Sequence, residues 1–204
     1  MSTKNAQRQR SRHPGLIDPN IGQVQQSIYA LWPFEGNLLD STGNGRHMTP
    51  TGTQIFVTGH NGTGQAVDFN GTSSSWATIP NFNLSTGTIS VWVYVRGLGT
   101  QRVVRSTSST ICLGIHQGNW EACGAGGPAV VLNTWHHIAI VQGVGMYLNG
   151  VLAMTTGASQ TAKANETTDV GRGPFGEPLD GSMDDMRWYN AVLSLSEVQY
   201  LASI

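Results

Sequence analysis

The chain has 204 residues, which is long enough to bury the core of one domain or at most two. Glycine is abundant at 26 residues and charged residues make up only 11% of the chain, while Ser, Thr and Asn separate short apolar runs. This composition is typical of an all-β protein. The formal net charge of −1 argues against nucleic-acid binding, and no apolar run approaches the length of a membrane span.

Residues 1–20 are polar, with four basic side chains against one acidic one, and they hold too little apolar surface to fold alone. We expect them to form an extended N-terminal arm, ahead of a sandwich domain over residues 21–204. The arm is either a disordered tail or a segment that becomes ordered on a partner protein. In the second case its contacts would come from Arg8, Arg10, Arg12, Leu16 and Ile17. No hydrophobic segment follows the basic residues, so no signal peptide is visible.

Short β-strands are predicted along the first half of the chain. They cover residues 29–34, 53–57, 64–69 and 76–79, with a loop of turn-forming residues at 40–46. The clearest strand of this half is residues 88–95, because its apolar residues alternate with Ser90, Trp92 and Tyr94. We expect it to be a central strand.

Residues 103–123 are predicted to form a hairpin with Gln117 and Gly118 as its two-residue turn. In that register Cys112 faces Cys123, and directly opposed residues have Cα atoms about 4.5–5.5 Å apart, within disulfide range. The two cysteines either form a disulfide or stay reduced as small core residues. No C-x-x-C spacing is present, so zinc is not expected.

The densest strand signal is residues 135–141, where Trp135 and His137 share one face and His136 lies on the other. Because the two histidines point to opposite faces, they cannot bind one metal together, and we expect one in the core and one at the sheet surface. Trp135 is predicted to be buried. A second hairpin follows, since Asn149 and Gly150 suit a type I′ turn.

The last part of the chain contains a glycine- and proline-marked loop at 163–178 with one short strand at 168–171, and then a final strand at 180–189. Residues 194–200 are predicted to form a short helix, with Ser194 as N-cap and Glu197 completing a capping box. The helix is expected to face the body of the domain through Leu195, Val198 and Leu201.

Three segments carry a resemblance to a known family. In chain order they read YALWPFEGNLLDSTGNG, NTWHHIAIVQGVGMYLNG and LDGSMDDMRWYNAVLSLSEVQYL. Together they resemble the laminin-G-like, concanavalin A-like lectin/glucanase domains, which include the pentraxins. The resemblance implies an all-β fold, in which two antiparallel sheets form a jelly-roll β-sandwich with a short C-terminal helix.

The resemblance also raises the question of catalysis, because sandwich glucanases of this kind cleave glycosides with an E-x-D-x-E cluster on one strand. In this chain no two glutamates lie within five residues, and the only close acidic pair noted is Asp184–Asp185, whose side chains point to opposite faces. A retaining mechanism needs two carboxyl groups about 5–5.5 Å apart across the sugar. We therefore expect a protein that is not an enzyme.

Two kinds of ligand follow from the resemblance. Family members often hold calcium at a rim, which here implies Asp40 and Asp184 as metal ligands. Alternatively, Asp40 caps a turn, and Asp184 or its neighbour Asp185 pairs with an arginine. Glycan binding would need exposed aromatic platforms, although tryptophans of a sandwich are more often core. The candidate platforms are Trp76, Trp92 and Trp120.

Two classes of function remain open. The first is a non-catalytic structural protein of a virion surface, such as a phage capsid decoration or tail-associated subunit that binds other subunits through residues 1–20. The second is an extracellular carbohydrate-binding protein, with or without calcium. The absence of a visible export signal favours the first class, so we expect a virion-surface location. Fold alone does not decide between them.

Overall fold

The computed structural model describes residues 24, 27–81, 86–155 and 165–204. The expected arm at residues 1–20 lies outside these ranges, together with its candidate contacts Arg8, Arg10, Arg12, Leu16 and Ile17. Strands and helix α2 of the described ranges run as follows: β1 (Ile28–Trp32), β2 (Thr49–Thr51), β3 (Ile55–Thr58), β4 (Gln65–Asn70), β5 (Trp76–Ile79), β6 (Thr88–Val95), β7 (Gln101–Ser106), β8 (Cys112–His116), β9 (Asn119–Ala122), β10 (Ala125–Ala129), β11 (Trp135–Val141), β12 (Gly145–Leu148), β13 (Val151–Thr155), β14 (Thr168–Val170), β15 (Asp180–Tyr189) and α2 (Leu195–Leu201). No helix among them is long and apolar enough to cross a membrane.

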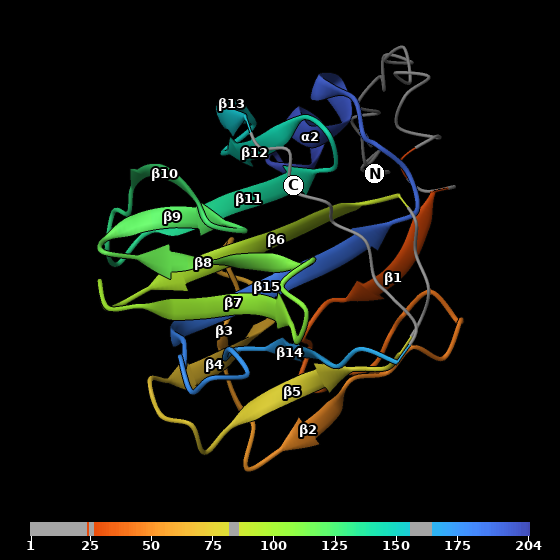
Figure 1. The fold of residues 1–204 in the computed structure, drawn as a ribbon. Helices are drawn as coiled ribbons and strands as arrows, with labels where there is room; N and C mark the ends of the chain where they lie inside the picture. The colour runs from red at the N-terminus through yellow and green to blue at the C-terminus, as the bar shows by residue number, and fades with distance from the viewer. Residues whose placement is uncertain (1–23, 25–26, 82–85, 156–164) are drawn as a thin grey trace, which may run out of the picture.

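Two antiparallel sheets pack face to face, as predicted (Figure 1). The eight-stranded sheet has the order β13-β12-β11-β6-β15-β4-β3, with β1 paired to β15. The seven-stranded sheet, nearer the viewer in Figure 1, has the order β10-β9-β8-β7-β14-β5-β2. Many neighbouring strands are far apart in sequence, which is the connectivity of a jelly roll.

The main core lies between the sheets and follows from strand alternation. On β6 the buried residues include Ile89, Val91 and Val93, and on β11 they include Ile138 and Ile140. Three tryptophans are completely buried in this core: Trp32, Trp120 and Trp188. Apolar side chains of this size are worth about 1.5–3 kcal/mol each when fully buried, so this layer is the main source of stability.

A second, smaller core lies on the outer face of the eight-stranded sheet, under α2. The helix begins with the predicted capping box, because Ser194 Oγ accepts from Glu197 N at 3.4 Å and Glu197 Oε2 accepts from Ser194 N at 2.6 Å. Val198 and Leu201 are buried as expected. Leu195 is 51% exposed, so that part of the prediction is wrong. Residues three apart are offset by about 60° around a helix, so Leu195 and Leu201 differ by about 120°. All three residues therefore cannot lie on one narrow face.

Both predicted hairpin turns are present. Gln117 and Gly118 have positive φ angles of 49° and 78°, and Asn149 and Gly150 have the same values, as a type I′ turn requires. The first hairpin has the predicted register, with Ile115 opposite Trp120. The second hairpin joins β12 to β13.

Candidate functional site

The outer face of the eight-stranded sheet is divided into two halves by α2. One half is covered by the helix and contributes Ala139, Val141 and Tyr189 to the smaller core. The other half carries aromatic and polar side chains that the helix leaves uncovered. We call this half the aromatic face, and it consists of His60, Asp68, Trp92, Tyr94, Arg96, Trp135, Asp180, Ser182 and Asp184.

Aromatic residues reach this face because alternate side chains of β6 and β11 point outward, and the register of the two strands places these side chains opposite each other. Trp135 on β11 lies opposite Tyr94 on β6, with ring centroids 5.6 Å apart, and His137 lies opposite Trp92. Trp92, Tyr94 and Trp135 are all partly exposed. The prediction that Trp135 is buried is therefore wrong: its parity places it on the outer face, beyond the rows that contact α2.

His60 covers Trp92. The two rings stack with centroids 4.4 Å apart and an interplanar angle of 14°. The imidazole is fixed by Asp184, whose Oδ2 lies 2.8 Å from His60 Nδ1 and accepts from His60 N at 2.9 Å, while His60 Nε2 lies 3.0 Å from the carbonyl oxygen of Ile204. Trp92 is thus an internal support, and the rings open to a ligand are those of Trp135 and Tyr94.

A polar network lies beside these two rings. Arg96 donates to Asp68 Oδ1 at 2.7 Å and to Asp180 Oδ1 at 2.9 Å, and Ser182 Oγ donates to Asp68 Oδ1 at 2.6 Å. Partial burial alone would lower the pKa of Arg96, but these hydrogen bonds raise it, so the guanidinium stays charged. The network is held in place before any ligand arrives, which reduces the entropy cost of binding.

Two shallow hollows open on the aromatic face. One, of about 240 Å³, is lined by Val57, Thr58, Asp68, Tyr94, Arg96, Trp135 and Ser182. The other, of about 260 Å³, is lined by His60, Asn61, Trp92, Ala202, Ser203 and Ile204. Apolar ring surface and hydrogen-bonding groups therefore meet in the same hollow, which is the combination that fixes a small polar ligand.

Three carboxylates share the aromatic face. Asp180 and Asp184 project from the same side of β15 with Ser182 between them, and Asp68 on β4 lies opposite Ser182. This grouping was not predicted, because Asp68 is far from β15 in the sequence and the adjacent pair Asp184–Asp185 points to opposite faces. In the structure Asp185 pairs with Arg187 at 3.1 Å. Asp68 and Asp180 form ion pairs with Arg96, and Asp184 is hydrogen-bonded to His60.

His136 and His137 lie on opposite faces, as predicted, but both are buried, so the expectation that one lies at the sheet surface is wrong. His136 is buried towards the main core, with Nε2 2.9 Å from the carbonyl oxygen of Val131. His137 is buried on the outer face, with Nε2 2.7 Å from Ser90 Oγ. Burial, with smaller contributions from the nearby charges of Arg187 and His60, lowers the pKa of His137 to about 3. His137 is therefore neutral at pH 7.

The two residues nominated for calcium have separate partners. Asp40 Oδ1 accepts from Leu31 N at 3.1 Å and from Thr42 N at 3.0 Å, while Oδ2 accepts from Arg46 N at 3.1 Å. Burial raises the pKa of Asp40, but these hydrogen bonds outweigh it and hold the pKa below its usual value. In the described part of the chain, no three His, Cys, Asp or Glu side chains converge as a metal site. Calcium binding stays a prediction, and the hydrogen bonds support the turn-capping role of Asp40.

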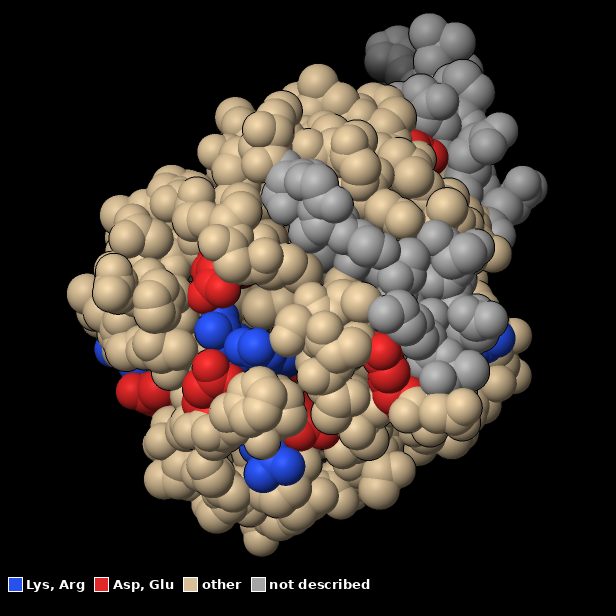
Figure 2. Space-filling view, in the orientation of Figure 1, with Lys and Arg blue, Asp and Glu red and all other residues tan. Residues whose placement is uncertain are grey.

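The seven-stranded sheet presents a different outer face (Figure 2), on which acidic and basic side chains gather together. Arg102 bridges Glu121 at 2.6 Å and Glu177 at 3.3 Å above a hollow of about 550 Å³. The hollow is lined by Arg102, His116, Gln117, Asn119, Trp120, Glu121, Gly124, Gly126 and Gly127. In this lining Arg102 and Glu121 bind each other, and the ring of Trp120 is buried.

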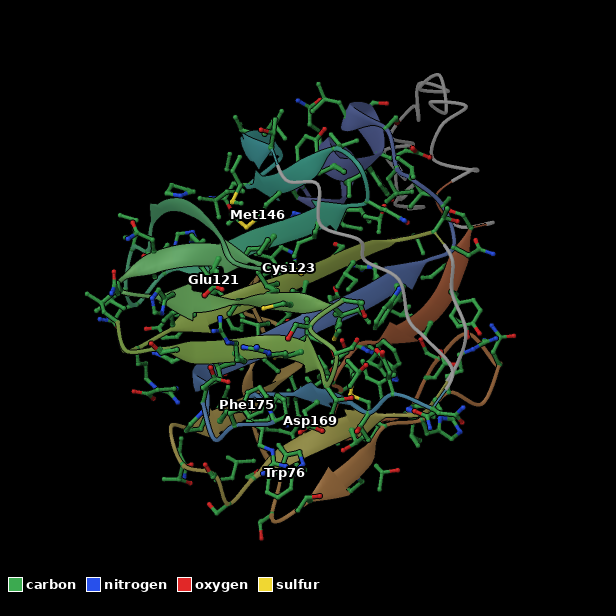
Figure 3. The ribbon with its side chains drawn as sticks, viewed as in Figure 1. Trp76, Glu121, Cys123, Met146, Asp169 and Phe175 are labelled. Carbon is green, nitrogen blue, oxygen red and sulfur yellow. The ribbon has the colours of Figure 1, made fainter. Side chains whose placement is uncertain are left out.

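The remaining tryptophan candidates belong to this second sheet. Trp120 is completely buried in the main core, so it cannot serve as a glycan platform, and that prediction is wrong. Trp76 lies on the outer face, near Asp169 and Phe175 in Figure 3. The guanidinium of Arg172 covers one face of its ring at 3.3 Å from the centroid, so that face is closed to a sugar.

Cys112 and Cys123 lie side by side at the open end of the β8–β9 hairpin, and they form no disulfide in the structure. Cys123 N donates to the carbonyl oxygen of Cys112 at 3.1 Å. The hydrogen bond from the thiol of Cys123 lowers the pKa of Cys112 to about 7, against the effect of burial and with help from Arg102 and Arg105. The two cysteines thus lie opposite each other, as predicted, and both are free thiols in the structure.

The jelly-roll fold and the open aromatic face define a lectin-like sandwich domain. The chain belongs to the concanavalin A-like lectin/glucanases superfamily, whose profile matches residues 61–199. A search of curated protein sequences finds no match.

Solved structures with the same fold include several binding domains. Domain 4 of AbnA, a GH43 extracellular arabinanase from Geobacillus stearothermophilus in complex with arabinotriose, superposes with a TM-score of 0.68 at 23% identity, covering 86% of this chain and 98% of that domain. The binding domain of Paraclostridial Mosquitocidal Protein 1 gives a TM-score of 0.65 at 18% identity over 88% of this chain and 52% of that one. The botulinum neurotoxin serotype D ligand binding domain in complex with N-acetylneuraminic acid gives 0.63 at 14% identity, over 90% and 52%. The chain spans about half of the toxin domains, and at these identities the likeness concerns the fold.

Proposed function

We propose that this protein binds glycans without cleaving them, through the aromatic face. The observation that carries the proposal is the pair of partly exposed rings of Trp135 and Tyr94, 5.6 Å apart, beside the ordered network of Arg96, Asp68 and Ser182. The apolar face of a sugar ring can pack on such rings, while its hydroxyl groups bond to fixed polar atoms. The arabinotriose and N-acetylneuraminic acid complexes of proteins with this fold support a sugar ligand.

The absence of catalysis is part of the proposal. A retaining glycosidase needs one carboxylate as nucleophile and one carboxylic acid as proton donor, on opposite sides of the glycosidic bond. On the aromatic face Asp180 and Asp68 both bind Arg96, and Asp184 binds His60. Because these carboxylates bind neighbouring side chains, none of them is placed as a nucleophile or as a proton donor. This arrangement supports a face that binds a sugar without cleaving it.

The test is a binding screen on immobilised glycans, including arabinotriose, xylotriose and lactose, with the full chain and two variants. Trp135→Ala removes one of the two partly exposed rings on which the sugar is proposed to pack. It should reduce the affinity at least tenfold, which is a loss of about 1.4 kcal/mol of binding free energy. Trp76→Ala is the matched control, since it removes a tryptophan from the outer face of the other sheet and should leave binding unchanged. Equal binding by Trp135→Ala and the unaltered protein would refute the proposal.

A second proposal is that the domain is carried on a virion surface by residues 1–20, with the glycan-binding face turned outward. The composition of this segment supports it, because four basic side chains with little apolar surface suit a segment that orders on a partner. A chain that begins at Ile21 should fold and bind glycans but fail to join the assembly. Normal assembly of that shortened chain would rule out anchoring by this segment and favour the extracellular alternative.

A further inference from the structure

The aromatic face has an unequal charge distribution that bears on which glycans it accepts. It presents three carboxylates, those of Asp68, Asp180 and Asp184, while its basic side chains among the described residues are two, Arg96 and the imidazole of His60. The next arginine on this sheet, Arg187, pairs with Asp185 and lies in the row of Ser90, towards α2. A ligand on Trp135 and Tyr94 therefore meets a surface richer in negative than in positive charge.

The hydrogen-bond donors of Arg96 are almost fully used. Nε donates to Asp180, Nη1 donates to Asp68 Oδ1, and Nη2 donates both to Asp68 Oδ2 at 3.3 Å and to the carbonyl oxygen of Phe69 at 2.6 Å. A guanidinium has five N–H groups, so one is left. Recognition of a carboxylate by arginine usually uses two parallel N–H groups, and Arg96 cannot provide them.

Acceptor capacity, by contrast, remains available. The side chain of Asp180 is 40% exposed and uses Oδ1 for its bond to Arg96. A carboxylate accepts about four hydrogen bonds in all. Asp180 can thus accept hydrogen bonds from a ligand, and the groups that suit it are the hydroxyls of an uncharged sugar.

From these observations we infer that the aromatic face selects neutral, hydroxyl-rich glycans and rejects sugars that carry a carboxylate, such as sialic or uronic acids. The inference deepens the proposed function and depends on it. The fold itself leaves the choice open, because structures that share it contain a neutral arabinotriose in one case and N-acetylneuraminic acid in another. The carboxylates around Arg96 decide it for this chain, since like charges at a binding site disfavour the wrong ligand.

The experiment compares matched sugar pairs by calorimetric titration of the full chain: lactose against 3′-sialyllactose, and xylotriose against its glucuronic acid-substituted form. The neutral member of a pair should bind at least tenfold more tightly in about 20 mM salt, and the difference should shrink in about 500 mM salt because the repulsion is screened. Asp180→Asn removes one repelling charge and should narrow the difference at least threefold. Asp169→Asn is the control, because it makes the same change in an arginine-paired aspartate of the other sheet (Figure 3).

The outcomes separate the two proposals. If the acidic sugars bind as tightly as the neutral ones and Trp135→Ala abolishes both, the aromatic face is the glycan site but the inference about charge is wrong. A discrimination that salt does not reduce also contradicts the inference, and this comparison uses the unaltered protein alone. A discrimination that Asp180→Asn does not narrow contradicts the inference as well. If no sugar binds, or if Trp135→Ala binds every sugar as the unaltered protein does, the proposed function fails and the inference fails with it.

Discussion

Trp135 and Tyr94 face each other across the β11–β6 strand pair, and both of their rings are partly exposed on the aromatic face. Their partner Trp92 has a similar place in the register, yet His60 stacks on its ring. His60 meets Trp135 through an edge contact, with ring centroids 6.2 Å apart, so the loop after β3 stacks on Trp92 but touches Trp135 at an edge.

Replacement of the two tryptophans Trp120 and Trp135 by alanine should separate core from surface. Trp120→Ala removes a completely buried ring and should cost about 3–5 kcal/mol of unfolding free energy. Trp135→Ala removes a partly exposed ring and should cost about 1 kcal/mol or less. Urea denaturation measures both. A loss at Trp135 as large as that at Trp120 would show that Trp135 belongs to the core after all.

Acid should destabilise the protein through His137. Its pKa is about 3 in the folded state but about 6.5 in an unfolded chain, so the unfolded state binds the proton more readily. The contribution of His137 to the unfolding free energy is fully present above about pH 6.5. It falls by up to about 1.4 kcal/mol per pH unit as the pH drops towards 3. Unfolding free energies between about pH 7.5 and 4.5 should show a smaller slope for His137→Gln. His116→Gln, at an exposed histidine, should keep the original slope, and equal slopes in both variants would contradict the prediction.

Removal of divalent metal should leave the stability unchanged. The oxygens of Asp40 already accept hydrogen bonds from Leu31, Thr42 and Arg46, so little capacity remains for calcium. The melting temperature with a chelator should equal that with added calcium. Asp40→Ala should in turn cost about 1–3 kcal/mol, because buried N–H groups lose their acceptor. A rise in melting temperature on calcium addition, abolished in Asp40→Ala, would establish the calcium site instead.

The thiols of Cys112 and Cys123 should join under mild oxidation. The two thiols are hydrogen-bonded neighbours, and with a pKa of about 7 Cys112 is largely thiolate just above neutral pH, the form that attacks a disulfide. Oxidised glutathione should therefore produce an intramolecular disulfide, with two molecules of reduced glutathione released. Peptide mapping without reductant detects the linked pair. Recovery of both cysteines as separate glutathione adducts would show that the hairpin cannot close the bond.

Hydrolysis of glycans should be absent. The purified protein, incubated with arabinan, xylan and β-glucan, should release no new reducing ends, because Arg96 binds Asp68 and Asp180 while His60 binds Asp184. Steady release that disappears in Asp180→Asn or Asp184→Asn would identify a catalytic site on β15. An activity retained in both variants would point to a contaminant.

Local pattern was enough to predict the strands that carry the core. The bounds of β5, β6, β11 and β15 agree with the expected segments, because successive side chains of a strand point to opposite sheet faces and the sequence shows that period of two. The strands β2 and β10 were not predicted. Their sequences, TPT and AGGPA, contain proline and glycine and no alternation, and they are strands because a neighbouring strand pairs with them.

The candidate site was only partly predictable. Alternation placed Trp92 and Tyr94 on one face, but which face stays open depends on where α2 docks, a contact between segments far apart in sequence. The same holds for the polar network, since the bond between Ser182 and Asp68 joins residues 114 positions apart. No local spacing predicts such a pair, and for that reason Asp68 and Arg96 were missed and Trp135 was assigned to the core.

The contact between His60 and the carbonyl oxygen of Ile204 has a practical consequence for handling the protein. Ile204 also lines the hollow beside Trp92, so any residues joined after it would emerge at the edge of the aromatic face. A tag fused directly after Ile204 would lie beside the hollow at Trp92 and alter the surroundings of the imidazole. Binding measurements should therefore use a tag at the other end, or one that is removed completely.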